Sequence, residues 1–308
     1  MTTMHTTLEA PSLAPQNAAV PRAPGFRSVL LRTRAALQWR LLLWWTILLL
    51  LPAIVATLPA WQLLSANLDH SLHAARLAEK LDMLAIADLV GSVRERAGAG
   101  IGTGGMVAVA LTLLFSPLLS GMTIAAVRNP QRLRFIPLLA AGAQEYGRLL
   151  RMLVWAVVPL GIAGALGGMA SSAAAKSAEA AILQSDAEHA SRLALVAMAV
   201  LLVLAHASLD AGRAVLGNEP RRRSAFLAWW GGLKLLLRRP LAVLGVYLVV
   251  TVVGLGVAAL LALGRFHVPA LGVGGTVGAF LLVQLGVVVL GIMRAARLAG
   301  LMELARKE

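Results

Sequence analysis

Six long apolar segments constrain this chain more than any other feature of its sequence. None of them contains Asp, Glu, Lys or Arg, and they cover residues 41–58, 106–127, 152–170, 193–209, 241–263 and 271–293. Each is long enough to cross a hydrocarbon core of about 30 Å as a helix. A backbone that faces lipid must satisfy its hydrogen bonds within its own segment, as a helix does. The sequence therefore predicts an all-α, polytopic transmembrane bundle whose six spans form three hairpins.

Composition agrees with this class. Of the 308 residues, 59% are apolar and 14% are charged, whereas an average soluble domain has about 25% charged residues. The membrane domain is expected to cover residues 26–300. Residues 1–25 are rich in Ala, Pro and Thr, a composition that predicts a disordered tail, and residues 301–308 form a short C-terminal tail.

The net charge of +14 is distributed in a way that predicts topology. Of the 28 Lys and Arg residues, 21 lie in the N-terminal tail, in the connections after the second and fourth spans, and in the C-terminal tail. This alternation is the positive-inside pattern of a bacterial inner-membrane protein with both termini in the cytoplasm. It explains the charge without nucleic acid as a partner. The sequence "TLPAW" after the first span leaves a cleaved signal peptide as the alternative for that span.

The three hairpins resemble one another in sequence. Basic amphipathic stretches that carry Trp or Tyr precede the first, third and fifth spans, and we expect each stretch to form an interfacial helix. The returning spans end on "SGMTIAAVRNP", "SLDAGRAVLGNEP" and "GIMRAARLAGL", where small residues are followed by Arg. A threefold repeat of an amphipathic helix and a hairpin accounts for this pattern. The alternative is that any positive-inside protein places Arg and Trp at these depths.

The stretch before the fifth span, "RSAFLAWWGGLKLLLRRP", is the most strongly amphipathic. Its apolar side chains recur at helical spacing, and the cations Lys234, Arg238 and Arg239 flank them. Such a helix lies in the headgroup plane, where cations attract anionic lipid. Two interpretations follow: specific contacts of these three side chains with lipid headgroups, or a helix that only anchors and orients the chain.

Ionisable residues within a span are costly and often functional. In the fourth span, His206, Asp210 and Arg213 form one stripe at helical spacing, and Gln284 is a polar residue in the middle of the sixth span. The stripe is interpreted either as a proton relay or anion-coupled gate of a small secondary transporter or permease subunit, or as an ion pair that orients the helix end. Gln284 is the possible neighbour of the stripe under the transport interpretation, and otherwise a source of interhelical hydrogen bonds.

Metal and phosphate chemistry have weaker support. In "NLDHSLHAARLAEKLD", His70 and His73 lie one turn apart and near Asp69, a set that could begin a zinc site. The HExxH spacing is absent and no third ligand is evident, so the favoured interpretation is an amphipathic cap outside the cytoplasm, with metal binding left open. "GAGIGTGG" at 98–105 lacks a Gly-Lys-Ser/Thr ending and predicts a close-packed helix start or a hinge. Gly164 with Gly168 and Gly274 with Gly278 are small-residue pairs that permit close helix packing.

The chain shows no signature of a membrane enzyme. It has no Cys, no Gly-x-Ser-Gly span with a partner histidine, no pair of glutamates in a span, and no nucleotide-binding motif. We therefore expect no catalysis and no cofactor, and we assign no residue to a metal site. The predicted function is an interaction, assembly or lipid-organising component. Its expected partners are the bilayer, including anionic lipids, and other membrane proteins.

Two stretches carry a family resemblance. "LDHSLHAARLAEKLD" and the later "LDAGRAVLGNEPRRRSAFLAWWGGLKLLLRRPLAVLGVYL", in a six-span layout, resemble a diffuse group of uncharacterised bacterial six-helix membrane proteins. This group is similar to the membrane domain attached to some glycerophosphodiester phosphodiesterases. The resemblance covers most of residues 26–300 and implies the fold. The catalytic domain of those fusions is not among these residues, so the resemblance implies no activity and no site residue.

Overall fold

In the computed structural model, the described residues are 38–68, 98–129, 131–180, 183–268 and 272–306. Every regular element within these ranges is a helix, and the helices are α2 (Trp39–Leu68), α5 (Gly98–Arg128), α6 (Phe135–Trp155), α7 (Val157–Ala180), α8 (Gln184–Asn218), α9 (Ala225–Arg238), α10 (Pro240–His267) and α11 (Gly272–Ala305). Six helical stretches are long and apolar enough to cross a membrane, one of them made of α6 and α7 together. The predicted all-α, six-span class is confirmed.

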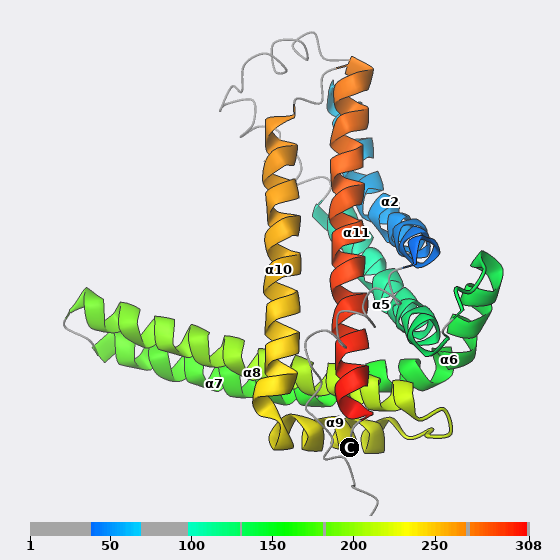
Figure 1. Cartoon of the computed structure of the whole chain (residues 1–308). Helices are drawn as coiled ribbons and strands as arrows, with labels where there is room; N and C mark the ends of the chain where they lie inside the picture. Colours follow the sequence, from blue (N-terminus) through cyan, green and yellow to red (C-terminus); the bar gives the residue numbers. More distant parts are fainter. Residues whose placement is uncertain (1–37, 69–97, 130, 181–182, 269–271, 307–308) are drawn as a thin grey trace, which may run out of the picture.

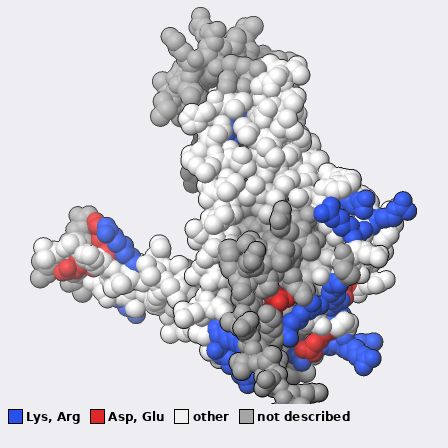
Figure 2. Space-filling model, in the orientation of Figure 1, with Lys and Arg blue, Asp and Glu red and all other residues white. Residues whose placement is uncertain are grey.

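The spans form three hairpins, α2 with α5, α7 with α8, and α10 with α11 (Figure 1). The hairpins meet where α5, α8 and α11 end and where α6 and α9 lie. We call this packed region the hub. Away from the hub the hairpins diverge, and the α7–α8 hairpin projects far from the upright α10–α11 hairpin (Figure 1). Lys and Arg gather around the hub, and a smaller group of both signs lies at the outer end of the α7–α8 hairpin, whereas the flanks between show little charge (Figure 2).

Side-chain burial also differs between the hub and the outer parts of the hairpins. The largest fully buried side chains lie in or beside the hub and include Leu119, Met122, Leu216, Leu235 and Leu301. By contrast, only 11% of the most apolar 18-residue windows of α10 and α11 is buried. Because lipid is as apolar as Leu, such flanks need no protein cover within a bilayer. The outer parts of the hairpins therefore present long apolar surfaces.

Two of the three predicted amphipathic helices are present, as α6 before α7 and α9 before α10. Each buries one stripe at helical spacing, with Leu138, Gly142, Leu149 and Met152 in α6 and Ala228, Gly232, Leu235 and Leu236 in α9. The Ser224 hydroxyl caps α9 by accepting a hydrogen bond of 3.3 Å from the Leu227 amide. Pro240 starts α10, as its fixed φ favours. The first predicted amphipathic stretch lies mainly outside the described residues.

Two predicted boundaries differ from the structure. The third span was expected from residue 152, but residues 152–155 belong to α6, and Ala156 separates α6 from α7. The glycine run at 98–105 forms the first turns of α5. A Cβ on Gly104 would lie 2.8 Å from Cγ of Pro59 in α2, so this end of α5 packs closely against α2. Gly104 thus packs as predicted for a close-packed helix start, whereas a Cβ on Gly100, Gly102 or Gly105 would meet no atom within 4 Å.

Close glycine contacts recur where a returning span meets the next amphipathic helix. A Cβ on Gly121 of α5 would lie 2.7 Å from the carbonyl oxygen of Gly142 in α6, and a Cβ on Gly232 of α9 would collide with the backbone of Gly212 in α8. The first two repeat units therefore share one packing device. The predicted small-residue pairs do not serve this purpose, since Gly164, Gly168 and Gly274 face open space.

Candidate functional site

The predicted stripe of α8 is the centre of a buried charged cluster. Asp210 and Arg213 are 6% and 9% exposed, and Oδ1 of Asp210 accepts a hydrogen bond of 2.5 Å from Nη1 of Arg213. They occupy one face of α8 because they lie three residues apart. Ala207 and Ala211 near them in α8 are fully buried, and the neighbouring Gly212 packs against α9, so α8 is covered by other helices at the level of the pair.

A second arginine reaches the same carboxylate from a different hairpin. Nε of Arg297 in α11 lies 2.6 Å from Oδ2 of Asp210 as an ion pair, and Arg297 is 4% exposed. Its Nη1 donates a hydrogen bond of 3.1 Å to the Thr251 hydroxyl of α10, and its guanidinium lies 4.7 Å from the centre of the Tyr247 ring. One carboxylate therefore links α8 to both helices of the third hairpin.

His206 is the outer member of this cluster. Its Nδ1 shares a hydrogen bond of 2.9 Å with the Tyr247 hydroxyl and lies 3.9 Å from Oδ2 of Asp210. Its side chain is 36% exposed, whereas that of Asp210 is 8% exposed. The structure thus brings together all three predicted stripe residues, and Tyr247 contacts both His206 and Arg297.

Arg294 connects the third hairpin to the first. It lies one turn before Arg297 in α11, and its Nη2 donates a hydrogen bond of 3.0 Å to the Ser116 hydroxyl of α5. Its guanidinium lies 5.8 Å from the ring centre of Trp45 in α2. Through Arg294, helix α11 contacts the α2–α5 hairpin, and through Arg297 it contacts the α7–α8 hairpin.

Other predicted site residues lie elsewhere. Gln284 precedes Arg294 by about 15 Å along α11, at about 1.5 Å per residue, so it is not a neighbour of the stripe. Lys234, Arg238 and Arg239 are exposed at the hub, and Nζ of Lys234 lies 5.9 Å from the Trp230 ring centre. They are separate from the Asp210 cluster.

A second charged cluster holds the end of α8. Glu145 of α6 accepts hydrogen bonds of 2.5 Å from both Arg128 of α5 and Arg148 of α6. Nε of Arg128 donates to the Gly217 carbonyl, and Nη2 of Arg148 donates to the Leu216 carbonyl at 2.8 Å. These cations satisfy carbonyls that the last turn of a helix leaves unpaired, and they complement its dipole.

Replacing Glu145 by Ala is expected to lower the unfolding free energy by about 1.5 kcal/mol, because two largely buried arginines lose a charged hydrogen bond. The measurement is SDS titration of the purified protein in mixed micelles. Glu188→Ala is the matched control, since the Glu188–Arg192 pair is 50% and 72% exposed and such pairs contribute little. Equal losses in the two variants would contradict the role assigned to Glu145.

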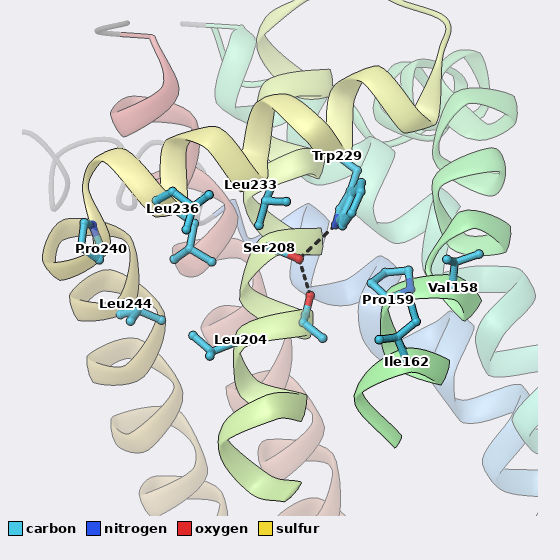
Figure 3. Close-up of a pocket in the computed structure, with 12 residues that line it drawn as sticks. Val158, Pro159, Ile162, Leu204, Ser208, Trp229, Leu233, Leu236, Pro240 and Leu244 are labelled. Atoms are coloured by element: carbon cyan, nitrogen blue, oxygen red, sulfur yellow. Dashed lines mark hydrogen bonds between the residues drawn. The ribbon is translucent and has the colours of Figure 1, made fainter. Parts of the chain in front are cut away.

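An apolar groove opens beneath α9, between that helix and helices α7, α8 and α10 (Figure 3). Its volume is about 530 Å³, and its walls are Val158, Pro159, Ile162, Leu204, Ala205, Ser208, Trp229, Leu233, Leu236, Leu237, Pro240 and Leu244. The two polar groups in these walls are paired. The Trp229 indole donates a hydrogen bond of 3.0 Å to the Ser208 hydroxyl, which donates one of 2.7 Å to the Ala205 carbonyl. The groove therefore offers an almost wholly apolar surface.

Metal ligands do not gather in the described ranges, where no group of three His, Asp or Glu side chains is close enough to hold an ion. His70 and His73 lie outside those ranges. The Asp210 cluster contains a carboxylate, guanidiniums, an imidazole and a phenol. Its geometry supports ion pairing and hydrogen bonding between helices.

Sequence reasoning missed Arg294, Arg297, Tyr247 and Thr251 as members of the cluster. A signal for the arginines was present, because each returning span ends on small residues followed by Arg. In the structure, Arg128 and Arg294 donate hydrogen bonds to other helices, and Arg213 pairs with Asp210, which in turn pairs with Arg297 of α11. Tyr247 and Thr251 carry no comparable signal, since single Tyr and Thr residues are ordinary in an apolar span.

No protein-family model, curated protein or solved structure matches this chain. The resemblance to six-helix bacterial membrane proteins therefore stays a prediction.

Proposed function

We propose that this chain is a non-catalytic component of a bacterial inner membrane that organises the proteins and lipids around it. The observation that carries the proposal is the uneven packing of the three hairpins. They are tightly joined at the hub, but their outer parts diverge and keep apolar flanks uncovered (Figure 1). The openings between such hairpins are filled in a bilayer by lipid or by helices of neighbouring proteins.

The proposed orientation places the hub and both termini on the cytoplasmic side. Lys and Arg gather around the hub, where α6 and α9 lie (Figure 2), and an excess of Lys and Arg favours the cytoplasmic side. The amphipathic helices α6 and α9 would then lie near the anionic headgroups of the inner leaflet. The distribution of charge and the packing of the helices support a scaffold whose hub lies on the cytoplasmic side.

The alternative function is a small secondary transporter or permease subunit. It is supported by the buried stripe, since ionisable groups at membrane depth often mark transport routes. The scaffold is favoured because Asp210 and Arg213 pair with each other and Asp210 also pairs with Arg297. Such pairing gives these charges a role in joining helices.

Photo-cross-linking in native membranes tests the scaffold. A photoreactive residue at Leu193 or Leu263, which are 71% and 55% exposed, is expected to capture a defined second membrane protein. Leu301, buried in the hub, is the control position and should capture none. Adducts with lipid alone at both outer positions would contradict an assembly role. Hydrolysis of lipid or peptide by the purified, reconstituted chain would overturn the non-catalytic assignment.

A further inference from the structure

We propose that the groove beneath α9 binds one acyl chain of an anionic glycerophospholipid, whose phosphate lies at Lys234, Arg238 and Arg239. This site deepens the proposed lipid-organising function by assigning it a ligand class. It depends on the groove and on α9, and it needs no protein partner.

The groove has the chemistry of an acyl-chain site. A volume of about 530 Å³ is within the usual range for small-molecule sites, which is about 300–1,000 Å³. Trp229 and Ser208 hydrogen-bond to each other, so neither leaves a polar group that a ligand must satisfy. An apolar chain is the ligand that gains most from such walls, because it meets no unpaired donor or acceptor.

The walls of the groove reach the lipid-facing surface of the protein. Ile162 of α7, Leu204 of α8 and Leu237 of α9 line the groove and are 57%, 38% and 72% exposed. These helices belong to different parts of the chain, and the exposure of their wall residues leaves the groove open to the surface. A lipid chain can therefore enter sideways from the leaflet in which α9 lies.

The charge of α9 selects the headgroup. Lys234 follows the wall residue Leu233, and Arg238 follows the wall residue Leu237. Successive residues of a helix are about 100° apart, so Lys234 lies to one side of the groove-lining face of α9. Arg238 and Arg239 lie where α9 ends, between the wall residues Leu237 and Pro240. All three cations are exposed, and the described part of α9 has no acidic residue. A phosphate beside these cations meets complementary charge while its acyl chain lies in the groove.

The test uses purified full-length protein in nanodiscs that contain equal amounts of phosphatidylglycerol and phosphatidylcholine, followed by native mass spectrometry after transfer to mild detergent. The wild type is expected to retain one phospholipid, with about tenfold more phosphatidylglycerol than phosphatidylcholine. Leu204→Trp fills the groove and should abolish retention. Leu195→Trp, the same change at an exposed site of α8 outside the groove, should retain lipid as the wild type does.

Headgroup selection is tested by the triple variant Lys234→Gln, Arg238→Gln and Arg239→Gln. It should still retain one lipid but lose the preference for phosphatidylglycerol. Retention by Leu204→Trp equal to that of the wild type, or no preference in the wild type, would overturn the proposal.

A second measurement needs only the wild-type fold. Phosphatidylglycerol with a diazirine near the end of its acyl chain should label the groove walls in α8 and α9, and excess unlabelled phosphatidylglycerol should suppress this labelling. Labelling spread evenly over the exposed flanks of all the hairpins would instead indicate bulk lipid and refute the site. Because this assay contains no other protein, its outcome is independent of the cross-linking test of the scaffold.

Discussion

Replacing Asp210 by Asn is expected to lower the unfolding free energy by about 3–5 kcal/mol, the usual cost of removing one partner from a buried ion pair. The carboxylate of Asp210 contacts Arg213 at 2.5 Å and Arg297 at 2.6 Å, and both arginines are nearly inaccessible. The amide carries no charge, so both guanidiniums would stay buried without their anion. SDS titration in mixed micelles measures the loss.

The control for this change is Asp186→Asn, which removes an exposed carboxylate from the first turn of the same helix. It should cost much less than Asp210→Asn. Adding Arg297→Met to Asp210→Asn should restore part of the stability, because it removes one of the two unpaired charges.

The Asp210→Asn variant also distinguishes the scaffold function from the transporter function. A transporter would lose proton-coupled flux in proteoliposomes on Asp210→Asn while keeping its stability. A structural cluster would lose stability and have no flux to lose. Unchanged stability together with lost flux would overturn the structural role assigned to Asp210.

Replacing Gly232 by Ala is expected to destabilise the protein by about 3 kcal/mol, the upper part of the usual range for overpacking. A Cβ at Gly232 would collide with the backbone of Gly212 in α8, and a backbone cannot rotate away as a side chain can. Helix α9 would have to move off α8, which would also disturb the groove. The measurement is the unfolding free energy by SDS titration.

Gly245→Ala is the matched control in the neighbouring helix α10. A Cβ at Gly245 meets no atom within 4 Å, so the substitution adds no clash. Ala favours a helix over Gly by about 1 kcal/mol, and the control should be neutral or stabilising. A loss at Gly232 no larger than the effect at Gly245 would contradict the close contact assigned to α9 and α8.

The sequence by itself determined the elements of this protein and their division into hairpins. Hydrophobicity along the chain identified six spans, because a helix must carry about 20 apolar residues to cross the hydrocarbon core. Apolar spacing in "AFLAWWGGLKLLLR" likewise identified α9 as amphipathic, and the same reasoning applied to α6. These properties depend on neighbours a few residues apart, so they can be read without knowing which helices meet.

The tertiary structure alone decided which helices meet. The sequence showed that Asp210 and Arg213 share a helical face. It did not show that Arg297, 87 positions after Asp210, forms a second ion pair with the same carboxylate. It marked Gly164 and Gly168 as candidates for close packing, whereas the structure uses Gly212 and Gly232. The groove is made by four helices, and no single segment encodes it.

The physical reason is the solvent. Within lipid no hydrophobic force drives one apolar helix against another, so partners are chosen by shape and by a few polar contacts between distant segments. Hydropathy therefore predicts that a helix crosses the membrane, and says little about its neighbours. The joining of the three hairpins through Arg294, Arg297 and the glycine contacts of α6 and α9 was decided by their fit in three dimensions.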